Sequence, residues 1–134
     1  MRRLALFGFL VLQACVSHGV RPLKPRDLAT APYQGVVAES VTGSLFYQGG
    51  CLLFRGDDPV VQLMPVWPTG SVFNGTSVIF TEPGRSDHPV IMNEEVVLEG
   101  RRLDWGAMSN RVYAPFQHQC VAQPFLVSHV RPAN

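Results

Sequence analysis

The chain has 134 residues, of which 46% are hydrophobic and 16% are charged, and its formal net charge at pH 7 is +1. This composition excludes an intrinsically disordered chain, which combines low hydrophobicity with high net charge. A charge so close to neutral gives no general attraction to nucleic acid or to an anionic membrane surface, so we expect no nucleic-acid partner.

The first residues have the pattern of an export signal. Arg2 and Arg3 form a charged start, residues 4–12 form an apolar run, and a small residue precedes Cys15. The run is too short for a transmembrane helix, which needs about 20 apolar residues. We therefore predict that residues 1–14 are a signal peptide and that the protein is exported.

The end of this signal, Leu12-Gln13-Ala14-Cys15, resembles the lipobox of bacterial lipoproteins. The resemblance implies that Cys15 is lipidated, becomes the mature N-terminus and attaches the protein to the membrane of the cell envelope. Val16 then implies delivery to the outer membrane, with the domain facing the periplasm. Gln13 departs from the usual small or β-branched residue. A cut after Gly19, giving a soluble periplasmic or secreted protein, is the alternative.

Residues 15–33 are rich in proline and contain several basic residues. Proline removes backbone donors and blocks helix formation, so such a segment is extended. We predict a solvated tether here. Removal of the signal leaves about 120 residues, which is enough for one domain, and we place that domain at residues 34–134.

Short segments rich in β-branched and aromatic residues fill this domain, separated by glycine and proline turns. The clearest pattern is a hairpin hinged by Gly56-Asp57-Asp58-Pro59, and Asn74-Gly75 is the strongest short hairpin signal. Gly43 is a candidate bulge. Apart from a possible helical turn at residues 107–110, no segment has a helical period. We expect strands at residues 34–47, 49–54, 60–70, 71–73, 76–81, 89–92, 94–99 and 125–130.

These strands predict an all-β fold. We expect a small closed or partly open antiparallel β-barrel of the OB type, because a chain with little helix hides its unpaired strand edges most completely by closure. A β-sandwich is the alternative.

The three cysteines have different expected roles. If Cys15 carries lipid, Cys51 and Cys120 remain as a pair in an oxidising compartment, where we expect a disulfide. Such a bridge closes a loop of about 70 residues and contributes on the order of 4 kcal/mol under the chain-entropy model. The alternative is two buried thiols.

Three further motifs resemble a group of small bacterial lipoprotein and exported β-domains. They are Gly49-Gly50-Cys51-Leu52, Val66-Trp67-Pro68 with Gly70, and Cys120 followed by residues 124–127. The resemblance covers roughly residues 35–130. It implies a small β-barrel with no established activity and transfers no catalytic residue.

Candidate chemistry is sparse. The histidines lack the paired spacing of zinc sites, and no nucleophile elbow surrounds a serine, so we expect no metal, cofactor or local catalytic motif. We expect a non-enzymatic module that binds an envelope protein or an oligosaccharide. Its candidate contact residues, each also compatible with a place in the core, are Tyr47, Trp105, Tyr113 and Phe116.

Two other functions stay open. One is an inhibitor of a secreted hydrolase, which would present residues 82–89 as a protruding loop. The other is a small hydrolase whose site is assembled from distant strands, and a cavity holding two of its candidate residues would support it. Those candidates are His88, His118, Asp104 and Glu94.

Overall fold

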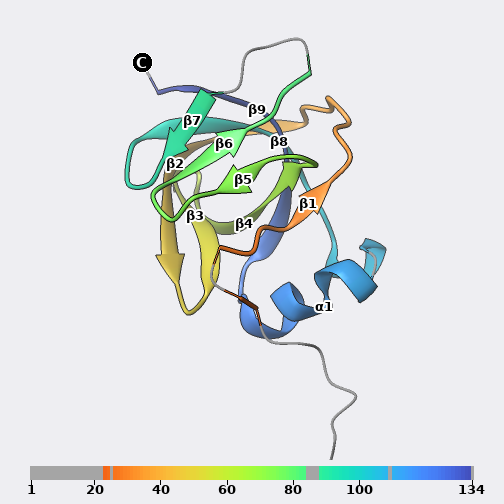
Figure 1. Ribbon diagram of the computed structural model, residues 1–134. Helices are drawn as coiled ribbons and strands as arrows, with labels where there is room; N and C mark the ends of the chain where they lie inside the picture. The colour runs from red at the N-terminus through yellow and green to blue at the C-terminus, as the bar shows by residue number, and fades with distance from the viewer. Residues whose placement is uncertain (1–22, 25, 84–87, 109, 134) are drawn as a thin grey trace, which may run out of the picture.

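The computed structural model of the protein describes residues 23–24, 26–83, 88–108 and 110–133, so the predicted signal peptide and Cys15 lie outside the described residues. Almost all of the regular structure is β (Figure 1). The strands are β1 (Thr30–Ala31), β2 (Glu39–Gln48), β3 (Cys51–Asp58), β4 (Val60–Pro68), β5 (Val72–Phe73), β6 (Ser77–Phe80), β7 (His88–Ile91), β8 (Val96–Arg102) and β9 (Gln123–Pro132). The helical elements in this part of the chain are the 3-10 helix η1 (Trp105–Ala107) and α1 (Asn110–Gln119).

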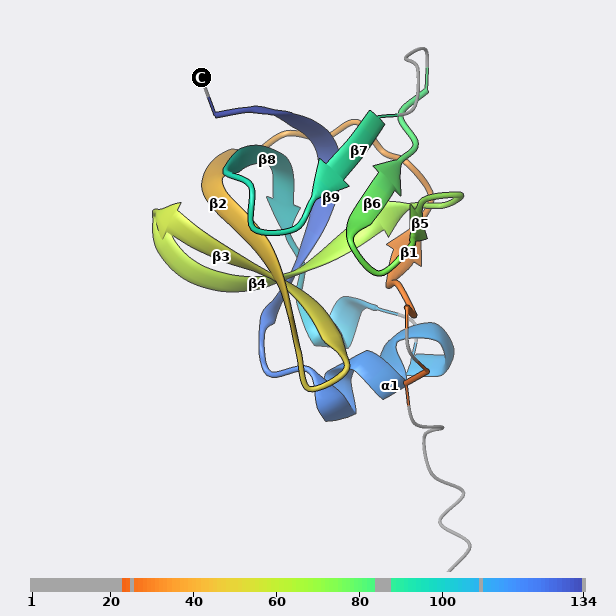
Figure 2. The same cartoon turned by 60° about the vertical axis from the view of Figure 1, so that its left-hand side comes forward.

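Five strands form a ring in the order β4-β3-β2-β8-β9, which closes because β9 also pairs with β4 (Figure 2). The all-β, OB-like prediction is confirmed, although the ring is uneven. One detail differs, since β4 and β9 are parallel, with Leu63–Val66 beside Gln123–Leu126. Parallel neighbours need a long crossover connection, and here the small sheet, β8 and α1 supply it. Three hairpin-linked strands followed by a returning strand form a Greek key.

Two glycines allow the ring to bend. The pairing of β2 shifts at Gly43, and the pairing of β8 shifts at Gly100. A Cβ at position 43 would lie 1.9 Å from the carbonyl oxygen of Arg55, and one at position 100 would lie 1.9 Å from that of Leu126. Only glycine permits such a close backbone approach, so the bulge predicted at Gly43 is confirmed.

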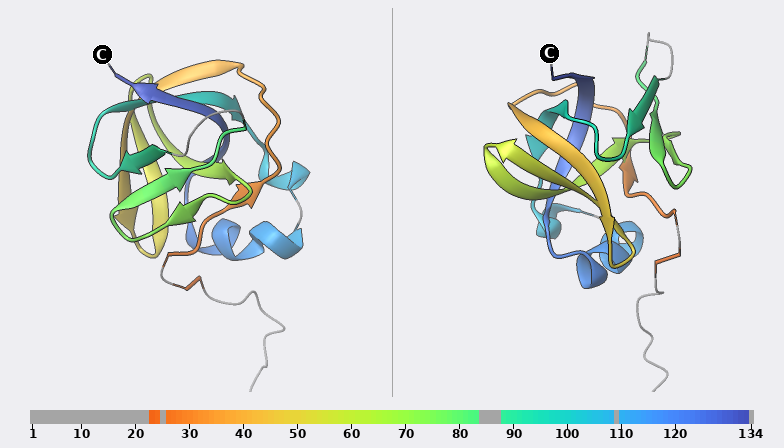
Figure 3. Two further views of the ribbon diagram at one scale, coloured as in Figure 1. Left: turned by 45° about the horizontal axis from the view of Figure 1, so that its top comes forward. Right: turned by 90° about the vertical axis from the view of Figure 1, so that its left-hand side faces the viewer.

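A second sheet, ordered β5-β6-β7, lies against one side of the ring (Figures 2 and 3). Its inner side chains join the interior of the ring in one core, in which the Trp67 and Phe80 rings meet edge to face at 6.1 Å. The predicted hairpin at Asn74-Gly75 links β5 to β6. The side-chain oxygen of Asn74 accepts hydrogen bonds from the backbone N–H groups of Thr76 (2.9 Å) and Ser77 (2.8 Å), which fixes this turn.

Helix α1 covers part of the outer face of the ring. Beneath it lies a second cluster of buried residues, called the outer cluster, which contains Ala29, Cys51, Leu53, Met64, Val66, Phe116, Cys120 and Leu126. The predicted disulfide is confirmed, with an S–S distance of 2.03 Å between Cys51 at the start of β3 and Cys120 after α1. The sequence did not predict α1, because residues 110–119 include Pro115 and lack a helical stripe. Packing and the bridge hold this helix, rather than intrinsic propensity.

The described part of the segment predicted to be a tether lies against the ring. Strand β1 runs parallel to β4, and Ala29 is only 3% exposed. The backbone N–H of Trp67 donates to the carbonyl oxygen of Ala29 at 2.8 Å. This part of the segment therefore belongs to the folded domain.

Candidate functional site

An open cleft lies where the end of β2 meets the small sheet. It has a cavity volume of about 240 Å³. Its walls come from five places in the chain and consist of Arg26, Tyr47, Phe73, Gly75 and Met92. We call this surface the aromatic cleft.

Two stacked rings form the main wall of the aromatic cleft. The centroids of Tyr47 and Phe73 are 6.0 Å apart and their planes differ by 28°. Phe73 is 5% exposed and belongs to the interior core, whereas Tyr47 is 41% exposed. The buried ring therefore fixes the position of the exposed one, and Tyr47 presents an apolar face with a polar hydroxyl at its edge.

The position of Tyr47 on its strand explains its exposure. Tyr47 continues the inward-facing series of Val41, Gly43 and Leu45, because alternate residues of a strand share one face. It lies near the end of β2, next to the tight turn at Gly49-Gly50, where the ring no longer surrounds it. Alternation alone would thus have predicted a core residue.

Backbone contacts hold the other walls of the aromatic cleft. Gly75 has a φ of +100°, which glycine adopts without strain. The backbone N–H of Met92 donates to the carbonyl oxygen of Thr76 at 3.0 Å, and that of Asn93 donates to Leu45 at 2.9 Å. The turn after β7 is thereby fastened both to the Asn74-Gly75 turn and to β2. These contacts preform the cleft.

Arg26 is the charged residue of the aromatic cleft. It lies in a turn closed by reciprocal hydrogen bonds, in which the Lys24 N–H donates to the Asp27 carboxylate at 2.8 Å and the Asp27 N–H donates to the Lys24 carbonyl at 3.2 Å. The backbone of Arg26 has a φ of +70°, which is uncommon outside glycine. Among the described residues, no hydrogen bond or ion pair engages its guanidinium group.

Gln119 ties this N-terminal turn to the rest of the site. Its side-chain oxygen accepts from the backbone N–H of Leu23 at 3.3 Å, and its side-chain nitrogen donates to the carbonyl oxygen of Gly49 at 2.8 Å. Gln119 immediately precedes Cys120 of the disulfide. The bridge therefore helps to position both the β2–β3 turn and the segment that carries Arg26.

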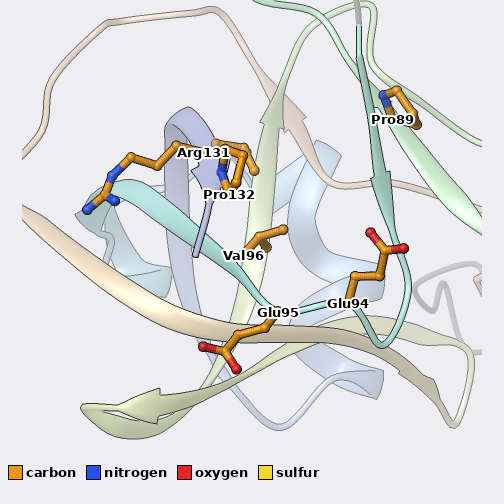
Figure 4. A pocket seen from close by; sticks show the side chains of 7 residues that line it. Pro89, Glu94, Glu95, Val96, Arg131 and Pro132 are labelled. Atoms are coloured by element: carbon orange, nitrogen blue, oxygen red, sulfur yellow. The ribbon is translucent and has the colours of Figure 1, made fainter. Parts of the chain in front are cut away.

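A second cavity, of about 190 Å³, lies between β7, the turn that follows it and the end of β9 (Figure 4). The side chains of Glu94 and Glu95 point in different directions there, so they form no carboxylate pair. Arg131, which also lines it, forms an ion pair with Glu99 at 2.8 Å. The charged groups of this cavity do not converge on a common point.

The structure distributes the predicted contact residues between two settings. Tyr47 is exposed in the aromatic cleft. Phe116 is 7% exposed, and the half-buried Trp105 donates from its indole nitrogen to the carbonyl oxygen of Ala122 at 3.2 Å, so both pack in or against the outer cluster. Tyr113 belongs to α1, but its side chain lies outside the description. Core placement, which the sequence left open, is therefore realised for two of these residues.

Of the residues considered for a hydrolase, Glu94, Asp104 and His118 lie at separate places in the described part of the chain. Glu94 lines the second cavity, Asp104 is exposed before η1, and His118 is exposed on α1. His88 is in β7, with its side chain undescribed. A search of the described residues found no group of three or more metal-binding side chains. Of the loop considered for inhibition, residues 84–87 lie outside the description.

One partly buried polar pair has no signal in the sequence. Glu82, which is 4% exposed, contacts Nδ1 of His129 on β9, and the ring of Tyr33 meets that of His129 edge-on at 6.2 Å. Nothing local marks these residues, because 47 positions separate Glu82 from His129. The pair fastens the segment after β6 to the ring.

Comparisons with protein-family models, with curated proteins and with solved structures gave no match. In the described residues, no helix has the length and apolar character required to cross a membrane. The geometry of the aromatic cleft is therefore the main evidence for a function.

Proposed function

We propose that this protein is a non-enzymatic binding module of the bacterial cell envelope that holds one sugar ring of an oligosaccharide in the aromatic cleft. The observation that carries the proposal is the exposed Tyr47 ring stacked on the buried Phe73 ring in an open cavity. The face of an aromatic ring carries partial negative charge. It attracts the C–H groups on one face of a sugar ring, while the hydroxyl groups at the edge of the sugar stay hydrated.

The size of the aromatic cleft favours a single ring. Its volume of about 240 Å³ is below the 300–1,000 Å³ typical of pockets that enclose a whole small molecule. The cleft is also open, so the remaining units of a longer chain can continue into solvent. One unit of a polymer fits these dimensions better than an entire ligand does.

The fold supports the same location. OB domains bind oligonucleotides and oligosaccharides on the face of their second and third strands and on nearby loops. In this ring those strands are β3 and β4, and their outward residues Leu53 and Met64 are buried in the outer cluster. The turn between the first two ring strands remains accessible beside Tyr47. This is an analogy at the level of fold, and the cleft residues provide the chemistry.

The near-neutral charge of the chain argues against the oligonucleotide alternative, because nucleic-acid affinity depends on many cationic contacts with phosphates. The proposed localisation in the cell envelope comes from the sequence. A lipid on Cys15 would hold the domain at a membrane of the envelope, where cell-surface oligosaccharides are within reach, and the disulfide suits an oxidising compartment.

Binding of envelope oligosaccharides to the full-length chain carrying Cys15→Ser tests the proposal. Tyr47→Ala should weaken binding at least tenfold, whereas Tyr47→Phe should retain most of it, because the ring makes the contact. Val121→Ala is a matched control, since Val121 is 89% exposed and does not line the cleft. Equal binding by wild type and Tyr47→Ala, or no binding to any oligosaccharide, would refute the proposed function.

The anchor has its own test. The wild-type protein should be found with the membranes of fractionated cells, and Cys15→Ser should move it to the soluble fraction. Recovery of the wild-type protein in the soluble fraction would favour the alternative cut after Gly19.

A further inference from the structure

We propose that the sugar ring held in the aromatic cleft carries a carboxylate, and that Arg26 binds it. This inference rests on the proposed function and adds the chemical class of the ligand. Three observations support it: the cleft carries one positive charge, the guanidinium group of Arg26 has no polar contact among the described residues, and this group lies beside Gly75 in the cleft wall.

The charge of the aromatic cleft has one sign. Of the five lining residues, Arg26 alone is charged, and no aspartate or glutamate lines the cavity. The neighbouring Asp27 uses its carboxylate to accept the backbone N–H of Lys24 at 2.8 Å. A ligand in the cleft therefore meets a cation at an apolar surface, which complements a ligand with an apolar face and one anionic group.

The guanidinium group of Arg26 is available for such a ligand. The guanidinium group of Arg55 lies 4.7 Å from the centroid of the Phe46 ring. Three other arginines in the described residues have polar partners: Arg102 contacts Glu39 at 2.6 Å, Arg131 contacts Glu99 at 2.8 Å, and Arg101 contacts Gln34 at 2.9 Å. Arg26 has no such polar contact among them. Its five donors lie in a plane that matches the two oxygens of a carboxylate.

The structure holds this group beside the cleft. A Cβ at position 75 would lie 3.6 Å from Nε of Arg26 and 3.7 Å from Nη2, so the guanidinium lies beside the bare backbone of the turn. The left-handed backbone of Arg26 lies in the Lys24–Asp27 turn, and Leu23 just before this turn donates a hydrogen bond to Gln119. A non-glycine residue in that conformation carries a backbone cost of about 1 kcal/mol, and such costs concentrate at ligand-binding sites.

A carboxylate fits better than a phosphate group. Phosphate recognition by side chains usually uses clusters of arginines, and the cleft offers one guanidinium without a second cation in its walls. A single guanidinium pairs in bidentate fashion with either group, so it is the single positive charge of the cleft that matches a singly charged carboxylate better than a phosphate group. The ligand class is therefore a uronic-acid-like sugar, with its ring on Tyr47 and its carboxylate on Arg26.

The experiment compares two probes with the same sugar units, an oligosaccharide of hexuronic acid units and its fully methyl-esterified form, in which each carboxylate is replaced by an uncharged methyl ester. Both are titrated into the full-length chain carrying Cys15→Ser. The wild-type cleft should bind the acid at least tenfold more tightly than the ester, because hydrogen bonds to charged groups are the stronger class.

Arg26→Gln should remove this preference by weakening only the acid form, and Arg26→Lys should restore part of it. Arg55→Gln is the matched control, since Arg55 lies over the Phe46 ring at 4.7 Å and does not line the cleft. It should leave both affinities unchanged.

The outcomes separate the two proposals. Equal affinity of the wild type for acid and ester would refute the carboxylate and leave ring binding intact. A preference that survives Arg26→Gln would refute the role of Arg26. Failure of both probes and of neutral oligosaccharides would refute the proposed function as well. Displacement of the acid by vesicles of anionic lipid, but not by excess hexuronate, would identify a lipid headgroup instead and overturn the inference.

Discussion

The ring carries aromatic side chains on two surfaces, the outer cluster and the aromatic cleft, which differ in how far these side chains are exposed to solvent. In the outer cluster, beside the disulfide, Phe116 of α1 is buried and the half-buried Trp105 packs against the cluster. In the aromatic cleft, Tyr47 is stacked on the core yet stays 41% exposed. The difference shows that an aromatic residue is accessible to a ligand only where no other element covers it, and that here the covering element is a helix held by a disulfide.

The two surfaces are not independent. Gln119 at the end of α1 contacts both Leu23, near Arg26, and Gly49, in the turn after Tyr47. The element that closes the outer cluster thus also supports one side of the aromatic cleft. Substitutions that loosen α1 should therefore also disturb the aromatic cleft, whereas substitutions at the exposed Tyr47 should leave the outer cluster unchanged.

The largest expected effect destroys both surfaces by breaking the ring beneath them. Gly100→Ala places a Cβ 1.9 Å from the carbonyl oxygen of Leu126. We expect a loss of about 5 kcal/mol or more in unfolding free energy, because the backbone of β8 and β9 must separate. Gly106→Ala is the control, since a Cβ there meets nothing within 4 Å. Urea unfolding measures both, and equal midpoints for the two variants would contradict the close packing of β8 and β9.

The second-largest effect should come from removing the disulfide, which should expose the outer cluster and leave the ring intact. Replacing both bridge cysteines, Cys51→Ser with Cys120→Ser, should lower the unfolding free energy by about 4 kcal/mol, because the bridge spans 69 positions of sequence. α1 should loosen from β3, so the folded variant should bind a hydrophobic dye that wild type does not bind. An unchanged unfolding midpoint without any dye binding would show that packing alone holds the helix.

The sequence predicted part of the outer cluster, namely its disulfide, but it did not predict how the aromatic cleft is assembled. Local turn chemistry located the strands, because Gly43, Asn74 and Gly75 act on their immediate neighbours, and cysteine number predicted the bridge. The parallel β4–β9 pairing, the Glu82–His129 pair and the assembly of the cleft were not predictable. Each depends on residues that are distant in sequence and meet only after the ring has closed.

A direct contrast between the surfaces comes from truncating one aromatic ring in each. Phe116→Ala should lower the unfolding free energy by about 3 kcal/mol, because it leaves a cavity in the outer cluster. Tyr47→Ala should cost about 1 kcal/mol, since it removes an exposed ring and one stacking contact. Only Tyr47→Ala should weaken oligosaccharide binding at least tenfold while the protein remains folded. Similar stability losses for the two variants would mean that Tyr47 is a core residue.

The smallest effect tests the link between the surfaces. Gln119→Ala removes its contacts with Leu23 and Gly49, which should cost about 1 kcal/mol in stability. It should also weaken binding of an acidic oligosaccharide severalfold, because the segment that carries Arg26 loses its attachment. Gln117→Ala, an exposed position on the same helix, should change neither quantity. An affinity unchanged by Gln119→Ala would show that the Lys24–Asp27 turn holds Arg26 without help.

The most direct measurement follows the methionine methyl groups by NMR during titration with an oligosaccharide. Met92 lines the aromatic cleft, whereas Met64 belongs to the outer cluster and Met108 packs against it. If the open surface is the binding site, the Met92 methyl signal should shift to saturation while those of Met64 and Met108 stay in place. Saturable shifts at Met64 and Met108, with Met92 unchanged, would contradict the assignment of binding to the aromatic cleft.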